Sequence, residues 1–276
     1  MIQLTCLNSP SRQTAARPCY ARHLQGLLLC WAALLLLLQP CMALDDWCSS
    51  STPSSGKFSL LLKTTCTLTS QVQVSSGNEL SIAGAPTELT SELAVITQVQ
   101  DADKDLHRLF WVEFGALRLA FVRLTGGRVS SAFSSSLTGW RACSGGLVYV
   151  GHAKTALLNA TKSVVFEGGK AERGGGLTAW GSKSTIWMGA GSVVKGNYAN
   201  YGGGGALVLY SSTLTTVNSV IHSNTAGSVG GGVFVHGSTL TTVNSVIHSN
   251  TAGSVGGGVY LRLSKTLSMT DSIVRV

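Results

Sequence analysis

The sequence predicts an all-β fold in which a single chain coils into a solenoid of stacked parallel strands. Three observations lead to this prediction. Ser212–Val233 and Ser238–Val259 are the same 22 residues, repeated 26 positions apart. Apolar and polar residues alternate within each copy, as strands with one buried face require. All five prolines lie at or before Pro86, so nothing in the repeats would interrupt an interior ladder of backbone hydrogen bonds.

Residues 1–43 have the pattern of a secretory signal peptide. Three arginines and no acidic residue precede an apolar run, Gly26–Leu38, and small residues at Cys41 and Ala43 fit cleavage after Ala43. A membrane anchor is the alternative, but the run is shorter than the roughly 20 apolar residues that span a bilayer. We therefore expect an extracellular or cell-surface protein made through the secretory pathway.

The next segment, residues 44–57, is a Ser-rich lead-in that we expect to be irregular. The formal net charge of the whole chain is +8, which is mild and, together with secretion, argues against nucleic acid as a partner. In an oxidising compartment Cys48 and Cys66 could form a disulfide and leave Cys143 odd. Three unconnected, mostly buried thiols are an equally good interpretation.

Residues 58–143 are interpreted as an N-terminal cap and the first turns of the same coil. Within Gly115–Gly127, Leu117 and Leu119 fall on one face and Arg118 on the other. A separate small β domain is the alternative, but no linker marks a join. The expected strand-like runs are Phe58–Lys63, Gln71–Ser75, Glu79–Ile82, Glu92–Gln98 and Leu109–Thr125.

Residues 144–276 hold the clear repeats. The residues that follow each glycine cluster are apolar, and those two places further on are apolar again, so both sets are predicted to form the repeat core. Two more strands, Ser238–Val243 and Ser245–His248, make three per repeat. The predicted core residues are Leu147, Leu177, Ala206, Val233 and Val259 at the first place, and Tyr149, Ala179, Val208, Val235 and Leu261 at the second.

Asparagine occupies one place in successive copies, at Asn197, Asn224 and Asn250. Stacked copies would place these side-chain amides one above another, where they could hydrogen-bond as a ladder. We interpret them as structural rather than ligand-binding. The last copy, from Ser264 to Val276, stops partway, and its open edge is expected to invite self-association.

The repeats resemble a known family. Gly204-Gly205-Ala206-Leu207 looks like the GGA(I/L/V) motif of the polymorphic outer membrane protein repeat, and the segments ending at Asn197, Asn224 and Asn250 resemble its F-x-x-N motif with a smaller aliphatic first residue. Phe166-Glu-Gly-Gly169 keeps the Phe and lacks the Asn. The resemblance covers roughly 58–276 and implies a right-handed, pectin-lyase-like parallel β-helix, often secreted or displayed and often adhesive.

The same resemblance offers an enzymatic alternative, a polysaccharide lyase or glycoside hydrolase, whose chemistry requires several carboxylates converging on one face. The repeats offer only Glu167 and Glu172, which flank a glycine-containing loop in one turn, and Asp271, which lies about four turns away, so no pair is expected to bracket one bond. Asp101, Asp103 and Asp105 do cluster, but they read better as a solvated loop. We therefore predict no catalytic residue.

Histidines do not change this interpretation. His222 and His248 are predicted to stack, with His236 on a neighbouring strand, and no third or fourth ligand is in register, so we predict no metal and no cofactor. Asn159 begins the one glycosylation sequon.

The leading hypothesis is a non-catalytic adhesive, structural or interaction surface for a polysaccharide or another protein. Basic residues that could favour anionic glycans are Arg118, Arg123, Arg128 and Arg141.

Overall fold

The computed structural model describes residues 56–63, 65–75, 77–85, 92–98, 107–129, 141–151 and 155–275. All of them lie in one unit, Met42–Val276. The predicted signal peptide and nearly all of the Ser-rich lead-in fall outside the described residues. Within the described ranges, no helix has the length and apolar character needed to cross a bilayer.

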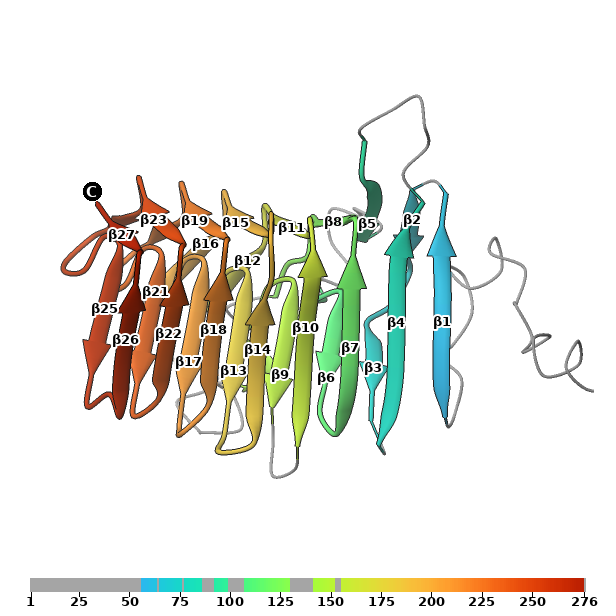
Figure 1. Cartoon of the computed structure of the whole chain (residues 1–276), viewed down its shortest axis with the longest axis horizontal. Coiled ribbons are helices and arrows are strands. Elements are labelled where there is room, and N and C mark those ends of the chain that lie inside the picture. The colour runs from blue at the N-terminus through green and yellow to red at the C-terminus, as the bar shows by residue number, and fades with distance from the viewer. Residues whose placement is uncertain are drawn as a thin grey trace, which may run out of the picture. The chain divides into compact units, whose positions relative to one another are not determined.

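The described chain runs in turn through four parallel sheets (Figure 1). Sheet 1 consists of β1 (Lys57–Leu62), β4 (Asn78–Gly84), β7 (Gly115–Ala120), β10 (Ala156–Lys162), β14 (Ser184–Met188), β18 (Thr213–Val217), β22 (Thr239–Val243) and β26 (Thr266–Thr270). Sheet 2 consists of β2 (Cys66–Leu68), β5 (Ala94–Gln98), β8 (Val122–Thr125), β11 (Val165–Glu167), β15 (Val193–Lys195), β19 (Val220–His222), β23 (Val246–His248) and β27 (Ile273–Val274).

Sheet 4 continues each coil after sheet 2, and from β12 onward a strand of sheet 3 lies between them. Sheet 3 consists of β12 (Lys170–Arg173), β16 (Tyr198–Gly202), β20 (Thr225–Ala226) and β24 (Thr251–Ala252). Sheet 4 consists of β3 (Val72–Val74), β6 (Phe110–Val112), β9 (Val148–Gly151), β13 (Leu177–Trp180), β17 (Ala206–Leu209), β21 (Val233–His236) and β25 (Val259–Arg262). The short strands of sheet 3 were not predicted; β20 and β24, with two residues each, are too short to show alternation.

Each strand pairs in parallel with its counterpart in the next coil, so the predicted solenoid is confirmed. Val233 pairs with Val259 across β21 and β25, and Ile221 pairs with Ile247 across β19 and β23. The strands of the first part of the chain, β1 to β8, belong to these same sheets.

Tight corners separate the sheets. Asn218 and Asn244 lie between sheets 1 and 2 with φ of 49° and 45°, and Ser223 and Ser249 lie between sheets 2 and 3 with φ of 54° and 51°. A single residue in the left-handed region turns the chain sharply, and Asn tolerates that region better than most residues do. Polar residues at the corners therefore fix where one strand ends and the next begins.

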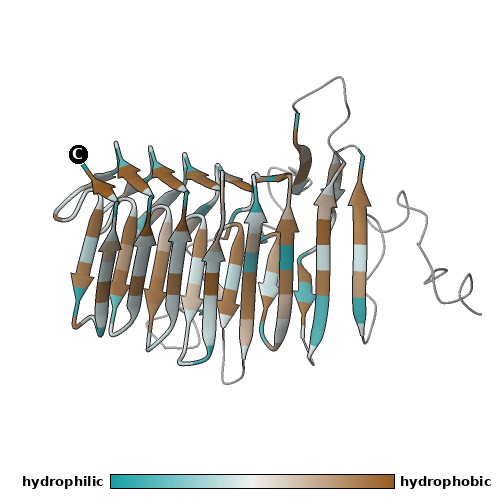
Figure 2. Ribbon diagram, viewed as in Figure 1, coloured by the Kyte–Doolittle hydropathy of each residue, from teal (hydrophilic) through white to brown (hydrophobic). Residues whose placement is uncertain are grey.

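The inward side chains form one continuous core. Val208 and Val235 are fully buried, and Leu117 and Leu119 of β7 point inward while Arg118 points out. Alternation of apolar with polar residues is visible along the strands (Figure 2). Leu261 belongs to the same inward row but is 36% exposed, because β25 is the last strand described in sheet 4.

The register of β9 corrects the predicted inward row: Leu147 belongs to the core as predicted, whereas Tyr149 does not point inward. Val148, not Leu147, pairs with Leu177, so Val148 begins the inward row and Tyr149 points outward. Leu147 is buried, but it occupies the place held by the third glycine of later clusters, such as Gly176. The first cluster has two glycines where the others have at least three, so counting from its end moved the predicted position by one residue and exchanged the faces.

The last coil exposes apolar side chains. Leu263 is 78% exposed, Ile273 is 50% exposed and Leu267 is 44% exposed. Leu267 continues the inward row of Leu240, and Val274, which is 41% exposed, continues that of Ile247; no described coil lies beyond them. The predicted self-association through this turn remains a prediction.

Candidate functional site

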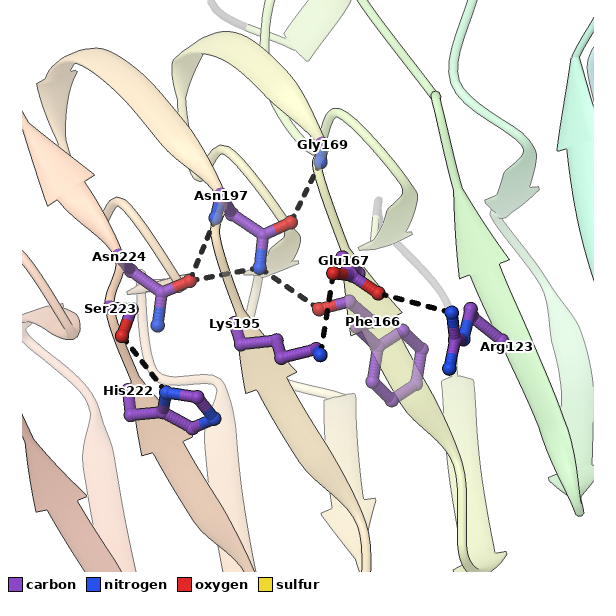
Figure 3. Close-up of polar contacts among 9 residues, drawn as sticks. All are labelled: Arg123, Phe166, Glu167, Gly169, Lys195, Asn197, His222, Ser223 and Asn224. Carbon is purple, nitrogen blue, oxygen red and sulfur yellow. Dashed lines mark hydrogen bonds and ion pairs between the residues drawn. The ribbon is translucent and has the colours of Figure 1, made fainter. Parts of the chain in front are cut away.

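The three asparagines form a buried ladder that runs from coil to coil, and Figure 3 shows its first two members, Asn197 and Asn224. The Asn197 side-chain Nδ2 donates to Oδ1 of Asn224 at 2.9 Å, and Nδ2 of Asn224 donates to Oδ1 of Asn250 at 3.0 Å. Each Nδ2 also donates to a carbonyl of sheet 2 in the preceding coil, such as that of Phe166. The amides are thus occupied by the protein itself, which supports the structural interpretation.

A charged row lies outside the ladder on sheet 2. Glu167 of β11 pairs with Lys195 of β15 at 3.3 Å and with Arg123 of β8 at 3.8 Å (Figure 3). The three side chains come from neighbouring coils because β8, β11 and β15 are adjacent in the sheet. Glu167 is therefore neutralised on both sides.

His222 and His248 continue this row as predicted, with ring centroids 5.1 Å apart and planes 3° from parallel. The Nδ1 atoms contact the Oγ atoms of Ser223 and Ser249 at 3.0 Å. Burial lowers the pKa of His222, and the neighbouring His248 and Lys195 lower it further. In the described part of the chain, no three His, Cys, Asp or Glu side chains gather as a metal site would require.

The carboxylates of the repeats lie apart. Glu167 is held by Lys195 and Arg123, and Glu172 of β12 accepts a hydrogen bond from Nδ2 of Asn200 at 2.7 Å. Asp271 lies in the corner between β26 and β27, several coils away. Asp101, Asp103 and Asp105 are outside the described residues.

The outer face of sheet 4 carries an aromatic cluster that the sequence analysis did not single out. The ring of Trp180 lies 4.7 Å from that of Tyr210, which lies 6.2 Å from the imidazole of His236. Phe234 joins them through contacts with His236 at 6.3 Å and with Tyr260 at 5.3 Å. We call these five residues the aromatic strip; they come from the successive coils that contain β13, β17, β21 and β25, strands that lie side by side in Figure 1.

The aromatic strip presents both apolar rings and cations to its surroundings. Tyr210 is 41% exposed, whereas Trp180, which its ring contacts, and Phe234 are each only 6% exposed. Arg141 lies 5.9 Å from the centre of the Trp180 ring, and exposed Arg262 pairs with His236 in the strand register. A flat, half-exposed ring beside positive charge is suited to a ligand with an apolar face and anionic substituents.

The four arginines named from the sequence do not gather on one face. Arg118 is paired with Glu79 at 2.5 Å, and its hydrogen bond lowers the pKa of that carboxyl. Arg123 is paired with Glu167, and Arg128 is exposed after β8. Only Arg141 lies beside the aromatic strip.

The structure describes the predicted glycosylation sequon and one cysteine of the predicted disulfide. Asn159 is half-buried in the middle of β10, between Arg118 and Trp187 in the register, so the sequon lies in a regular strand and glycosylation stays a prediction. Cys66 is in a disulfide bond, but Cys48 lies outside the described residues, so the pairing also stays a prediction. Cys143 is buried, and burial raises the pKa of its thiol.

Comparison with known proteins agrees with this architecture. Residues 141–275 match the family model described as right handed beta helix region. No curated protein matches the chain, and no solved structure matches it. The fold is therefore an all-β, right-handed, single-stranded parallel β-helix.

Proposed function

We propose that this β-helix is a secreted or surface-displayed, non-catalytic interaction protein that binds acidic glycans through the aromatic strip. The observation that carries the proposal is the half-exposed ring of Tyr210, supported by Trp180 and flanked by His236. Tyr and Trp are favoured at recognition surfaces because they offer large apolar area at low entropic cost. The C–H face of a sugar ring fits such a surface, and Arg141 and Arg262 complement an anionic substituent.

The solenoid scaffold favours an extended ligand. Successive strands of a sheet lie about 4.8 Å apart, so the aromatic strip repeats along the coil axis rather than forming one enclosed site. A polymer lying across several coils would contact Tyr210, His236 and Arg262 in sequence. The proposal includes secretion and an adhesive role. It also includes membership of the proteins with polymorphic outer membrane protein repeats, which the repeat motifs resemble.

The dispersed carboxylates support a non-catalytic role. Cleavage of an acidic polysaccharide by paired carboxylates needs two of them flanking one bond. Among the described residues, Glu167 is paired with two cations and Glu172 accepts a hydrogen bond from Asn200. The two carboxylates therefore do not face each other across one bond.

The test compares Tyr210→Ala with Tyr198→Ala, because both tyrosines are 41% exposed and only Tyr210 belongs to the strip. Binding to polygalacturonate and to a neutral glucan is measured by calorimetry, with product analysis for new chain ends. We expect Tyr210→Ala to weaken polygalacturonate binding about tenfold and Tyr198→Ala to leave it unchanged. Equal affinities for both variants, no binding, or cleaved polymer would overturn the proposal.

A further inference from the structure

Arg108 is a buried cation without a carboxylate partner among the described residues. Its side chain, 2% exposed, lies against the outer face of sheet 4, with its guanidinium carbon 4.8 Å from the centre of the Trp111 ring and 5.1 Å from that of Tyr149. Burial lowers the pKa of Arg108 to about 10, so the guanidinium is still charged at neutral pH. An isolated buried charge is costly unless hydrogen bonds or a counter-charge compensate it.

Only one of its three nitrogens has hydrogen-bond acceptors. Nη2 donates to the carbonyl oxygens of Arg141 at 3.1 Å and Ala142 at 2.5 Å, whereas Nε and Nη1 are buried with no acceptor. The aromatic rings compensate part of the charge through cation–π contact. They do not satisfy the N–H groups, which project in the plane of the guanidinium.

Neighbouring side chains present further groups of the same kind. Nε1 of Trp111, the hydroxyl of Tyr149 and Nε of Arg141 are all buried without a hydrogen-bond partner. Trp111 and Tyr149 have ring centroids 5.4 Å apart, and both Arg141 and Arg108 act electrostatically on the Tyr149 hydroxyl. Together with Nε and Nη1 of Arg108 these make five atoms that can donate a hydrogen bond, and a buried donor left without an acceptor destabilises the folded state.

We propose that Arg108, Trp111, Tyr149 and Arg141 form a binding site for a small oxyanion, a carboxylate or a sulfate group. Such a group is the complement of the cluster, because it brings only acceptors and one or two negative charges. Trp111 and Arg141 are half-buried as residues while their donor atoms are buried, so an anion enters from their side only as these side chains move. The site shares Arg141 with the proposed glycan surface, but Arg108, Trp111 and Tyr149 take no part in the aromatic strip, so the inference stands if Tyr210 binds no glycan.

The test measures the thermal midpoint of the full chain in sodium acetate, sodium sulfate and oligogalacturonate, at ionic strength held constant with sodium chloride. A ligand that binds only the folded state raises the midpoint along a saturation curve, whereas general salting-out by sulfate does not saturate. Tyr149→Phe deletes the hydroxyl and keeps the ring, and Trp111→Phe deletes the indole N–H and leaves a smaller aromatic ring. We expect each to weaken the anion about three- to tenfold, Arg108→Gln to abolish the saturable shift, and exposed Arg128→Gln to leave it intact.

The probes also separate the two sources of the oxyanion. A saturable shift with acetate or sulfate alone identifies a free anion, and a shift with oligogalacturonate at lower carboxylate concentration identifies a glycan substituent. The proposal is overturned if no probe gives a saturable shift, or if Tyr149→Phe and Trp111→Phe bind like the unmodified chain. It is also overturned if saturable binding arises only after Asp101, Asp103 and Asp105 are changed to Asn, because the site would then be filled by the chain's own carboxylate.

Discussion

At the residue scale, Asn224 connects three coils through one amide. Its Oδ1 accepts from the backbone N and from Nδ2 of Asn197, and its Nδ2 donates to Val194 and Asn250. All of these groups are buried, so no water replaces a lost partner. Specificity for the stacked register therefore resides in a polar group inside an otherwise apolar core.

We expect Asn224→Ala to lower the free energy of unfolding by about 2–4 kcal/mol, because it leaves donors of Asn197 and an acceptor lone pair of Asn250 without partners. Urea unfolding followed by circular dichroism measures the change. Asn200→Ala is the matched control, since Asn200 is exposed and makes one hydrogen bond to Glu172, and it should change stability by less than ~0.5 kcal/mol. Similar losses in the two variants would contradict a stabilising ladder.

The residues of the proposed oxyanion site could not be brought together from the sequence. Arg108 and Trp111 precede the repeats, in a coil for which no second copy fixes the register by comparison. Tyr149 was placed on the inner face, one residue out of register, so its hydroxyl could not be counted among the outward donors. The sequence contained one chemical indication of the site. Trp and Tyr seldom bury an N–H or O–H group without a partner, so a Trp and a Tyr near Arg108 favour a bound acceptor.

At the element scale, the inward face of sheet 1 contains an unusual pair of hydroxyls. Thr216 and Thr242 are each 1% exposed and their Oγ1 atoms have no hydrogen-bond partner. The register aligns them with Met188 in one direction and Met269 in the other, so the place accepts apolar side chains. A buried hydroxyl without a partner costs free energy that an isosteric methyl group would not.

Thr216→Val should therefore raise the free energy of unfolding by about 1 kcal/mol and the thermal midpoint by a few degrees. Thr215→Val serves as control, because Thr215 points outward in the same strand and is half-buried, and it should have little effect. Both midpoints are measured by differential scanning calorimetry. Destabilisation by Thr216→Val would mean that the hydroxyl has a partner, such as a buried water molecule.

The strand register was predicted correctly where two copies of the repeat could be aligned with each other. It was predicted one residue out at β9, where the copy is incomplete. The strands of sheets 1 and 2 alternate clearly, and two identical copies fix Val233 over Val259. The first glycine cluster lacks its third glycine, and Leu147 stands there instead. A Cβ at Gly169, the residue in the place of the asparagine, would lie 2.7 Å from Cγ of Leu147. Leu147 thus fills the space that an asparagine side chain at position 169 would occupy. The glycine-cluster motif and the F-x-x-N motif change together here, and neither motif alone predicts the change.

At the scale of the whole molecule, each coil contacts chiefly its two neighbours, so stability should accumulate coil by coil. The identical copies allow this to be tested without creating a foreign junction. Removing residues 212–237 joins Ser211 to Ser238, which begins the same sequence as Ser212, and places Asn250 next to Asn197 in the ladder. No strand changes its sheet, and no inward residue becomes an outward one.

We expect this 26-residue deletion to fold into the same β-helix with a smaller urea m-value, since less surface is exposed on unfolding, and with lower stability because one interface between coils is lost. Circular dichroism and urea titration provide the measurements. Removing only residues 225–237 joins the end of sheet 2 directly to sheet 1 and skips sheets 3 and 4, so that variant should fail to fold. If it folds as well as the whole-coil deletion, stacking of equivalent residues does not determine the structure.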